Sequence, residues 1–99
     1  MVLFEIFWTA RAKVDFARLR GSANLAKRYR AVKKAIKLLS SNPRHPGLQT
    51  HEFTSLKGPD GEKVFEAYAE QNTPAAYRVF WCYGPCTNQI TIIAIVRHP

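Results

Sequence analysis

The 99-residue sequence lacks the features that mark several whole classes of protein. No apolar run approaches the length of about 20 residues that a membrane-spanning helix needs, so we expect a soluble protein without a membrane partner. The first residues, Met1 to Glu5, contain no basic segment and no small-residue cleavage site, which argues against a secretory signal. We therefore expect a cytoplasmic protein.

Cysteine is scarce, and histidine is not grouped. Cys82 and Cys86 are too few for a disulfide framework and have the wrong spacing for a zinc knuckle. Reduced thiols are the expectation in a reducing cytosol, and a bridge across a hairpin is the alternative. The three histidines and two cysteines show no ligand spacing, so we predict no metal site and no cofactor.

Acidic residues are few. Seven Asp and Glu face fifteen Lys and Arg, which gives a formal net charge of +8. Such a charge attracts polyanions over a Debye length or more, so RNA, DNA, a ribosome and an acidic protein are the expected classes of partner. The alternative is that the surplus of lysine only aids solubility.

Apolar residues, by contrast, are plentiful. Hydrophobic residues make up 46% of the chain and aromatic residues 12%, which is typical of a folded globular protein. A chain of this length has room for one hydrophobic core, so we predict a single domain over residues 1–99.

The first half of the chain predicts one strand and two helices. Val2 to Trp8 are β-branched or aromatic almost throughout, which favours a strand. Thr9 can cap a helix that runs to about Arg20 and ends at Gly21. A second helix, capped by Ser22 or Asn24, should end before Asn42-Pro43, because proline disfavours helical geometry in the preceding residue.

The second predicted helix is amphipathic and strongly basic. Its apolar stripe repeats at helical spacing and consists of Leu25, Tyr29, Val32, Ile36 and Leu39. The outer faces carry cations that we expect to contact nucleic acid, namely Lys27, Arg30, Lys33, Lys34 and Lys37. Arg28 also lies outside the stripe. The alternative is an ordinary solvated face.

The second half of the chain is β-rich. Leu48 to Leu56 favours a weak strand or a loop, and three stronger strands are predicted over Glu62 to Glu70, Ala76 to Tyr83 and Gln89 to Arg97. Turn residues between them predict an antiparallel meander, which the first strand joins beside the last. The fold class is therefore α+β, in the order β-α-α-β(3-4), with two N-terminal helices packed on an antiparallel sheet.

Three segments resemble those of the RelE/ParE superfamily of bacterial toxins. The first is the link after the second helix, Asn42-Pro43-Arg44-His45-Pro46-Gly47-Leu48, with the following Thr50-His51-Glu52-Phe53. The second is the Tyr-Arg strand, Ala76-Tyr77-Arg78-Val79-Phe80-Trp81. The third is the closing strand with its basic end, Ile90 to His98. With the preceding β-α-α layout, this resemblance covers nearly the whole chain.

The resemblance implies the toxin of a type II toxin–antitoxin system, with a cognate antitoxin protein as partner. Members act either as ribosome-dependent mRNA interferases, which are metal-free endoribonucleases that inhibit translation, or as inhibitors of DNA gyrase. The interferase, with the ribosome and mRNA as partners, is our prediction, and a ParE-type gyrase inhibitor is the alternative. A third possibility is a non-catalytic protein that binds operator DNA through its antitoxin.

Strand parity predicts a site on one face of the sheet. If the last hairpin closes symmetrically, Tyr83 faces Ile90 and Arg78 faces Ile95, which places Arg97 diagonally beside Arg78. In the preceding hairpin, Ala69 opposite Tyr77 puts two further side chains on this face. The predicted cluster is Glu66, Tyr68, Arg78 and Arg97, and a slip of one residue in either hairpin would scatter it.

Such a cluster could cleave RNA by attack of a 2′-hydroxyl on the adjacent phosphate, which needs a proton acceptor, a proton donor and positive charge. Arg78 would stabilise the five-coordinate phosphate with help from Arg97. His98 is a candidate acid or base, Glu66 is a second candidate for the base, and Tyr68 could stack on a nucleobase or donate a proton.

Each of these assignments has a structural alternative. Arg78 could form an ion pair with Glu66 or Glu70, and His98 could be a solvated chain end. We interpret His45 and His51 as loop-packing or surface residues. RelE-like interferases often carry lysines on the strand that holds Glu66 and Tyr68 here, so this sequence departs from that pattern.

Overall fold

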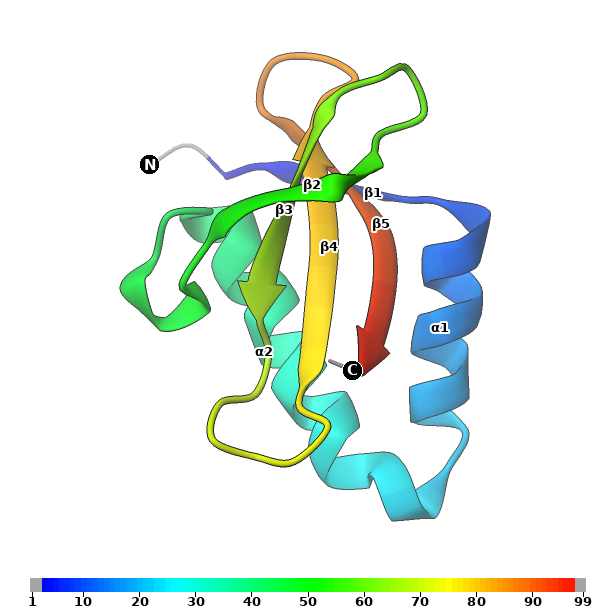
Figure 1. Ribbon diagram of the computed structural model, residues 1–99. Coiled ribbons are helices and arrows are strands. Elements are labelled where there is room, and N and C mark those ends of the chain that lie inside the picture. Colours follow the sequence, from blue (N-terminus) through cyan, green and yellow to red (C-terminus); the bar gives the residue numbers. More distant parts are fainter. Residues whose placement is uncertain (1–2, 98–99) are drawn as a thin grey trace.

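The computed structural model describes residues 3–97, so the predicted catalytic residue His98 lies outside the described part (Figure 1). The elements in chain order are β1 (Glu5–Trp8), α1 (Ala10–Arg20), a 3-10 turn (Ala23–Leu25), α2 (Ala26–Ser41), a second 3-10 turn (Pro46–Leu48), β2 (His51–Lys57), β3 (Lys63–Tyr68), β4 (Tyr77–Tyr83) and β5 (Gln89–Arg97). The predicted α+β class is confirmed.

The strands form a single five-stranded sheet in the order β1-β5-β4-β3-β2. β1 lies beside β5, as predicted, and pairs with it in parallel, whereas the other neighbours are antiparallel. Both helices cover the same face (Figure 1). The main core lies between them and the sheet, where Leu19, Val32 and Leu39 pack with Val79 and Trp81.

The two helices begin differently. The Thr9 hydroxyl accepts a hydrogen bond from the N–H of Ala12 at 3.1 Å, so the predicted cap of α1 is confirmed. The prediction of a Ser22 or Asn24 cap on α2 is wrong, because Leu25 occupies the cap position and makes no side-chain cap bond. The preceding 3-10 turn runs directly into α2, and its Ala23 carbonyl accepts the N–H of Ala26, the first residue of α2.

A second, smaller core lies on the face that the helices leave open. β2 leaves the plane of the sheet and crosses in front of β3 and β4 (Figure 1). Its Phe53 and Leu56 pack against Val64 and Phe80, and the rings of Phe53 and Phe80 are 4.7 Å apart between centroids. β2 therefore covers one part of this face and leaves the part beside Arg78 to polar side chains.

A β-bulge in β5 changes the predicted register. Tyr83 pairs with Ile90, as predicted, but Trp81 pairs with Ile92 and Phe80 with Ala94, so Ile93 is an extra residue. The predictions that Arg78 faces Ile95 and that Arg97 shares its face are therefore wrong. Arg78 pairs with Val96 and Arg97 with Tyr77, whose ring packs on the helix side of the sheet.

Helix α1 stabilises this bulge. The Thr9 hydroxyl donates to the carbonyl oxygen of Ile93 at 2.8 Å, and the N–H of Ile95 donates to Asp15 Oδ2 at 2.9 Å. These bonds satisfy backbone groups that the disrupted ladder leaves unpaired. The partners are 84 and 80 positions apart in the chain, so the local hairpin pattern contains no sign of them.

Candidate functional site

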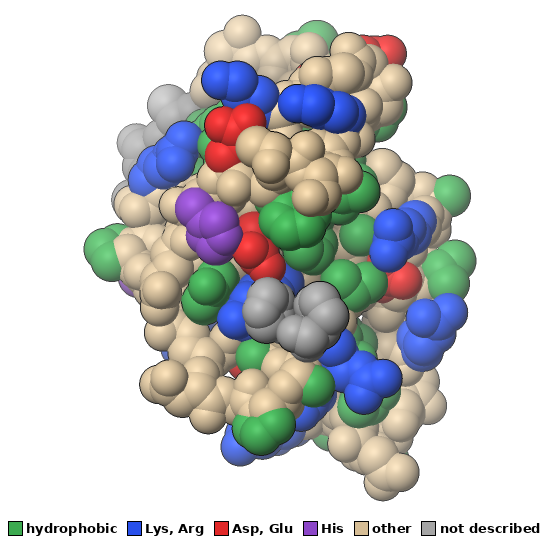
Figure 2. Space-filling model, viewed as in Figure 1, with side chains coloured by type: hydrophobic (Ala, Val, Ile, Leu, Met, Phe, Trp, Pro, Cys, Tyr) green, Lys and Arg blue, Asp and Glu red, His purple; other side chains and the backbone are tan. Residues whose placement is uncertain are grey.

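Three of the predicted site residues lie together on the open face. β3 and β4 pair in the predicted register, with Glu66 opposite Phe80 and Tyr68 opposite Arg78. Cross-strand partners share a face, so Glu66, Tyr68 and Arg78 converge there. Figure 2 views this side of the molecule and shows a histidine next to an acidic side chain near its centre.

Arg78 is held on three sides. Its Nη1 donates to the carbonyl oxygen of Glu70 at 2.8 Å, and its Nε lies 3.5 Å from Glu66 Oε2. The guanidinium carbon lies 3.7 Å from the centroid of the Tyr68 ring, which is a cation–π contact. Arg78 is only 7% exposed. The ion pair with Glu66, which the sequence offered as the structural alternative, is present in the structure.

A fourth residue, which was not among the predicted site residues, completes the site. His51 begins β2, directly opposite Glu66, and its Nε2 lies 2.7 Å from Glu66 Oε1. Its ring meets the Tyr68 ring edge-on at 5.7 Å, and its side chain is 47% exposed. The sequence predicted a loop-packing or surface role for it, because Leu48 to Leu56 gave only a weak strand and no register with β3. His51, Glu66, Tyr68 and Arg78 form what we call the polar cluster.

The hydrogen bonds of the polar cluster place its protons. His51 Nδ1 lies 2.9 Å from the carbonyl oxygen of Gln49, which can only accept, so Nδ1 carries a hydrogen. The other nitrogen, His51 Nε2, faces the carboxylate oxygen Glu66 Oε1. Glu66 is 5% exposed and both its oxygens face protein partners, so it holds Arg78 and His51 in place.

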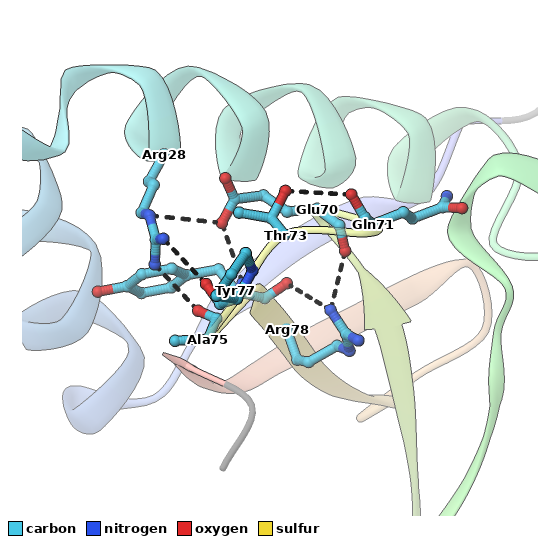
Figure 3. Close-up of polar contacts among 8 residues, drawn as sticks. Arg28, Glu70, Gln71, Thr73, Ala75, Tyr77 and Arg78 are labelled. Atoms are coloured by element: carbon cyan, nitrogen blue, oxygen red, sulfur yellow. Dashed lines mark hydrogen bonds and ion pairs between the residues drawn. The ribbon is translucent and has the colours of Figure 1, made fainter.

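An arginine on α2 anchors the loop that holds Arg78 (Figure 3). Arg28 Nη1 and Nη2 donate to the carbonyl oxygens of Ala75 and Pro74 at 2.9 and 3.2 Å. Arg28 Nε also lies 3.8 Å from Glu70 Oε1, which accepts the N–H of Tyr77 at 3.1 Å. Since the Glu70 carbonyl accepts from Arg78, α2 fixes the guanidinium through this loop.

The predicted basic surface is present on α2. Its five cations are all exposed, and four of them line a groove of about 700 Å³ between α2 and β1. Ile6 and Ile36 supply its aliphatic floor. We call this the basic groove, and its residues are Ile6, Arg30, Lys33, Lys34, Ile36, Lys37 and Ser40.

Both cysteines are free thiols, as expected. Burial raises the pKa of the Cys82 thiol to about 11, and the charge of Glu62 adds to this effect, so Cys82 stays protonated near neutral pH. Within residues 3–97, no three His, Cys, Asp or Glu side chains are grouped closely enough to hold a metal ion. Over the same residues, neither helix has the length and apolar character needed to cross a membrane.

No known family profile and no curated protein sequence matches the chain. Solved structures do match it over nearly its whole length. The YoeB/ParE toxin from Agrobacterium tumefaciens superposes with a TM-score of 0.72 at 14% identity, over 97% of this chain and 100% of that one. The archaeal RelE in the RelE–RelB complex from Pyrococcus horikoshii OT3 gives 0.62 at 15% identity, over 98% and 96%.

A third match is the YoeB dimer from Staphylococcus aureus, with a TM-score of 0.61 at 14% identity, over 97% of this chain and 98% of that one. The element order, the parallel pairing of β1 with β5 and the helices on one face complete the correspondence. This chain has the fold of the RelE/ParE toxin superfamily.

Proposed function

We propose that this protein is the toxin of a type II toxin–antitoxin pair and that it acts in the cytoplasm as a ribosome-dependent mRNA interferase. The observation that carries this proposal is the polar cluster, in which a guanidinium, a phenol and an imidazole converge on the uncovered face of the sheet. Metal-free RNA cleavage needs positive charge and groups that transfer protons, and side chains of these types can supply both. The similar structures named YoeB, RelE and YafQ support the same class of function.

In the proposed reaction, a base takes the proton of one nucleotide's 2′-hydroxyl while the 2′-oxygen attacks the adjacent phosphorus. The bond from phosphorus to the 5′-oxygen breaks, the 5′-oxygen takes up a proton, and a 2′,3′-cyclic phosphate remains. Arg78 stabilises the added charge on the phosphate. Among residues 3–97 only its Nη1 donates hydrogen bonds, and we propose that Nη2 donates to a phosphate oxygen. Tyr68 and the exposed edge of His51 are the proposed contacts to the nucleotide, and His98 remains a predicted proton carrier.

Arg78→Lys tests this proposal. Lysine keeps the charge but loses the planar fork, so we expect mRNA cleavage to fall about 100-fold and growth arrest to be relieved. Cleavage is measured by mapping mRNA ends after induction without antitoxin. The matched control is Arg18→Lys on the exposed side of α1, which should leave growth arrest unchanged.

Other results of this experiment would overturn the proposal. Undiminished growth arrest by a folded, well-expressed Arg78→Lys protein would exclude Arg78 from catalysis. DNA breaks that depend on gyrase, with intact mRNA, would instead identify a ParE-type inhibitor. If neither damage occurs, the protein is a non-catalytic partner that binds operator DNA through its antitoxin.

The antitoxin is the proposed occupant of the basic groove. The aliphatic floor and the cationic rim suit an acidic segment that also carries aliphatic side chains. The N–H groups of Glu5 and Thr9 donate to the carbonyl oxygens of Asn88 and Ile92. Because successive N–H groups of a strand point to opposite sides, the N–H of Ile6 points to the outer edge of β1. An extended antitoxin segment could therefore add to this edge as a strand.

Charge reversal in the basic groove tests this assignment. We expect Lys33→Glu with Lys37→Glu to weaken antitoxin binding by about 10-fold or more, since like charges would then face each other. The measurement is calorimetric titration with the antitoxin, which we expect to be a short acidic protein encoded beside this gene. Lys13→Glu with Lys57→Glu changes the net charge equally and lies outside the groove, so an equal loss of affinity there would refute a specific groove contact.

A further inference from the structure

We propose that a second cleft, next to the polar cluster, binds the RNA nucleotide that flanks the cleaved phosphate and so sets the base preference of the protein. The cleft lies between α2, the turn before β2 and the end of β3, and its volume is about 540 Å³. The residues that carry the inference are Ala31, Lys34, Leu38, His45, Tyr68 and Gln71. The inference rests on the proposed function, because it names RNA as the ligand.

Small side chains create the space. Ala31 and Ala35 on α2 and Ala69, directly after β3, line the cleft with methyl groups, which take up little of its volume. Leu38 extends the apolar wall. A flat apolar wall suits the face of a nucleobase, and the volume falls within the range of about 300 to 1,000 Å³ that is usual for small-molecule sites.

Two polar side chains at the cleft suit the phosphate and the base edge of a nucleotide. Lys34 is exposed at the cleft and can contact a phosphate. His45 accepts the N–H of Gly47 at its Nδ1, at 2.9 Å, so in the neutral ring the hydrogen lies on Nε2. His45 therefore offers a donor of fixed position to a base carbonyl or ring nitrogen, which is a contact that distinguishes one base from another.

The cleft is held open by a hydrogen-bonded brace. Gln71 Nε2 donates to the carbonyl oxygen of Gly47 at 2.9 Å, and Gln71 Oε1 accepts from Gln49 Nε2 at 2.6 Å. These bonds tie the turn before β2 to the loop after β3. A site fixed in advance loses less conformational freedom when its ligand binds.

Tyr68 connects the cleft to the polar cluster. Tyr68 is one of the residues that line the cleft. The centroid of its ring lies 3.7 Å from the guanidinium carbon of Arg78 and 5.7 Å from the centroid of the His51 ring. A phosphate at Arg78 and a nucleotide in the cleft would therefore contact the same residue. This continuity favours a flanking RNA nucleotide over an unrelated small ligand.

Filling the cleft is the first test. Ala31 is partly exposed, and leucine is a good helix former, so Ala31→Leu should fold while it occupies the space for the base. Mapped cleavage sites should then lose their base preference, with the ratio of favoured to disfavoured nucleotides falling about 10-fold or more. Lys13→Ala on α1, away from the cleft, should leave the ratio unchanged. An unchanged ratio in the Ala31→Leu protein would overturn the inference.

The second test does not need cleavage. Each of the four ribonucleoside 5′-monophosphates is added to the purified protein, and the amide signals of Ala31, Gly47 and Ala69 are followed by NMR. We expect saturable shifts that differ between bases, are reduced in Ala31→Leu and are not reproduced by inorganic phosphate. Shifts that phosphate alone reproduces, or no shifts at the cleft, would overturn the inference.

The two tests separate the inference from the proposed function. Base-dependent binding in the cleft without any cleavage by the unaltered protein would refute the interferase proposal and keep the nucleotide site. Cleavage by the unaltered protein, with no binding and with the same base preference after Ala31→Leu, would refute the cleft alone.

Discussion

Glu66→Ala should lower the free energy of unfolding by about 3 to 5 kcal/mol. Glu66 is 5% exposed and lies between the Arg78 guanidinium at 3.5 Å and the His51 imidazole at 2.7 Å. Removing the carboxylate leaves the Arg78 charge buried without a counter-ion, and the cost of that desolvated charge dominates the effect. Urea denaturation, followed by tryptophan fluorescence, measures the change.

A double variant distinguishes this cause from lost packing. Glu66→Leu combined with Arg78→Met removes both charges and keeps the apolar volume, so we expect it to regain most of the lost stability. Glu52→Ala, an exposed glutamate on the neighbouring strand, should stay within about 0.5 kcal/mol. If Glu66→Ala costs less than about 1 kcal/mol, the ion pair is not a structural element. A stable double variant that no longer arrests growth would separate the structural role of Arg78 from its proposed catalytic role.

Asp15→Ala should cost about 2 to 3 kcal/mol of unfolding free energy. The Asp15 carboxylate accepts the N–H of Ile95 at 2.9 Å, and Ile95 is 2% exposed, so its buried amide would lose this acceptor. The ion pairs of Asp15 with Arg11 and Arg18 are 3.8 and 3.9 Å long and involve exposed arginines, so they contribute little. Urea denaturation and hydrogen exchange of the Ile95 amide measure the two consequences.

Two further variants identify the cause. Asp15→Asn keeps an oxygen acceptor and should lose less than half as much stability, whereas Arg11→Ala should stay within about 0.5 kcal/mol. Unchanged protection of the Ile95 amide in Asp15→Ala would show that the destabilisation arises elsewhere than at the bulge.

Much of the fold could be predicted because its local signals agree. β-branched and aromatic residues with turn residues between them predicted β5 with its observed bounds, Gln89–Arg97, and β4 to within one residue. The register of β3 on β4 followed from a single assumed pair, and it brought Glu66, Tyr68 and Arg78 together as predicted.

The rest depended on contacts between distant parts of the chain. Arg97 was assigned to the wrong face because the Ile93 bulge is stabilised by Thr9 and Asp15, which precede the hairpin by almost the whole sequence. His51 was missed because an irregular link precedes β2, and no periodicity relates that link to Glu66. The part of the site that lies within one hairpin was therefore predictable, and the parts joined across the fold were not.

The parallel pairing of β1 with β5 also constrains how the protein matures during synthesis. The N-terminal strand emerges first, yet its partner is the last strand to be made, and contacts of such high sequence separation form late and slowly. Until Gln89–Arg97 has left the ribosome, β1 and the N-terminal end of α1 have no sheet to complete, and apolar side chains stay uncovered. Completion of the sheet therefore waits for the strand most distant from β1 in sequence, so β1 should be among the last parts of the fold to gain protection from hydrogen exchange.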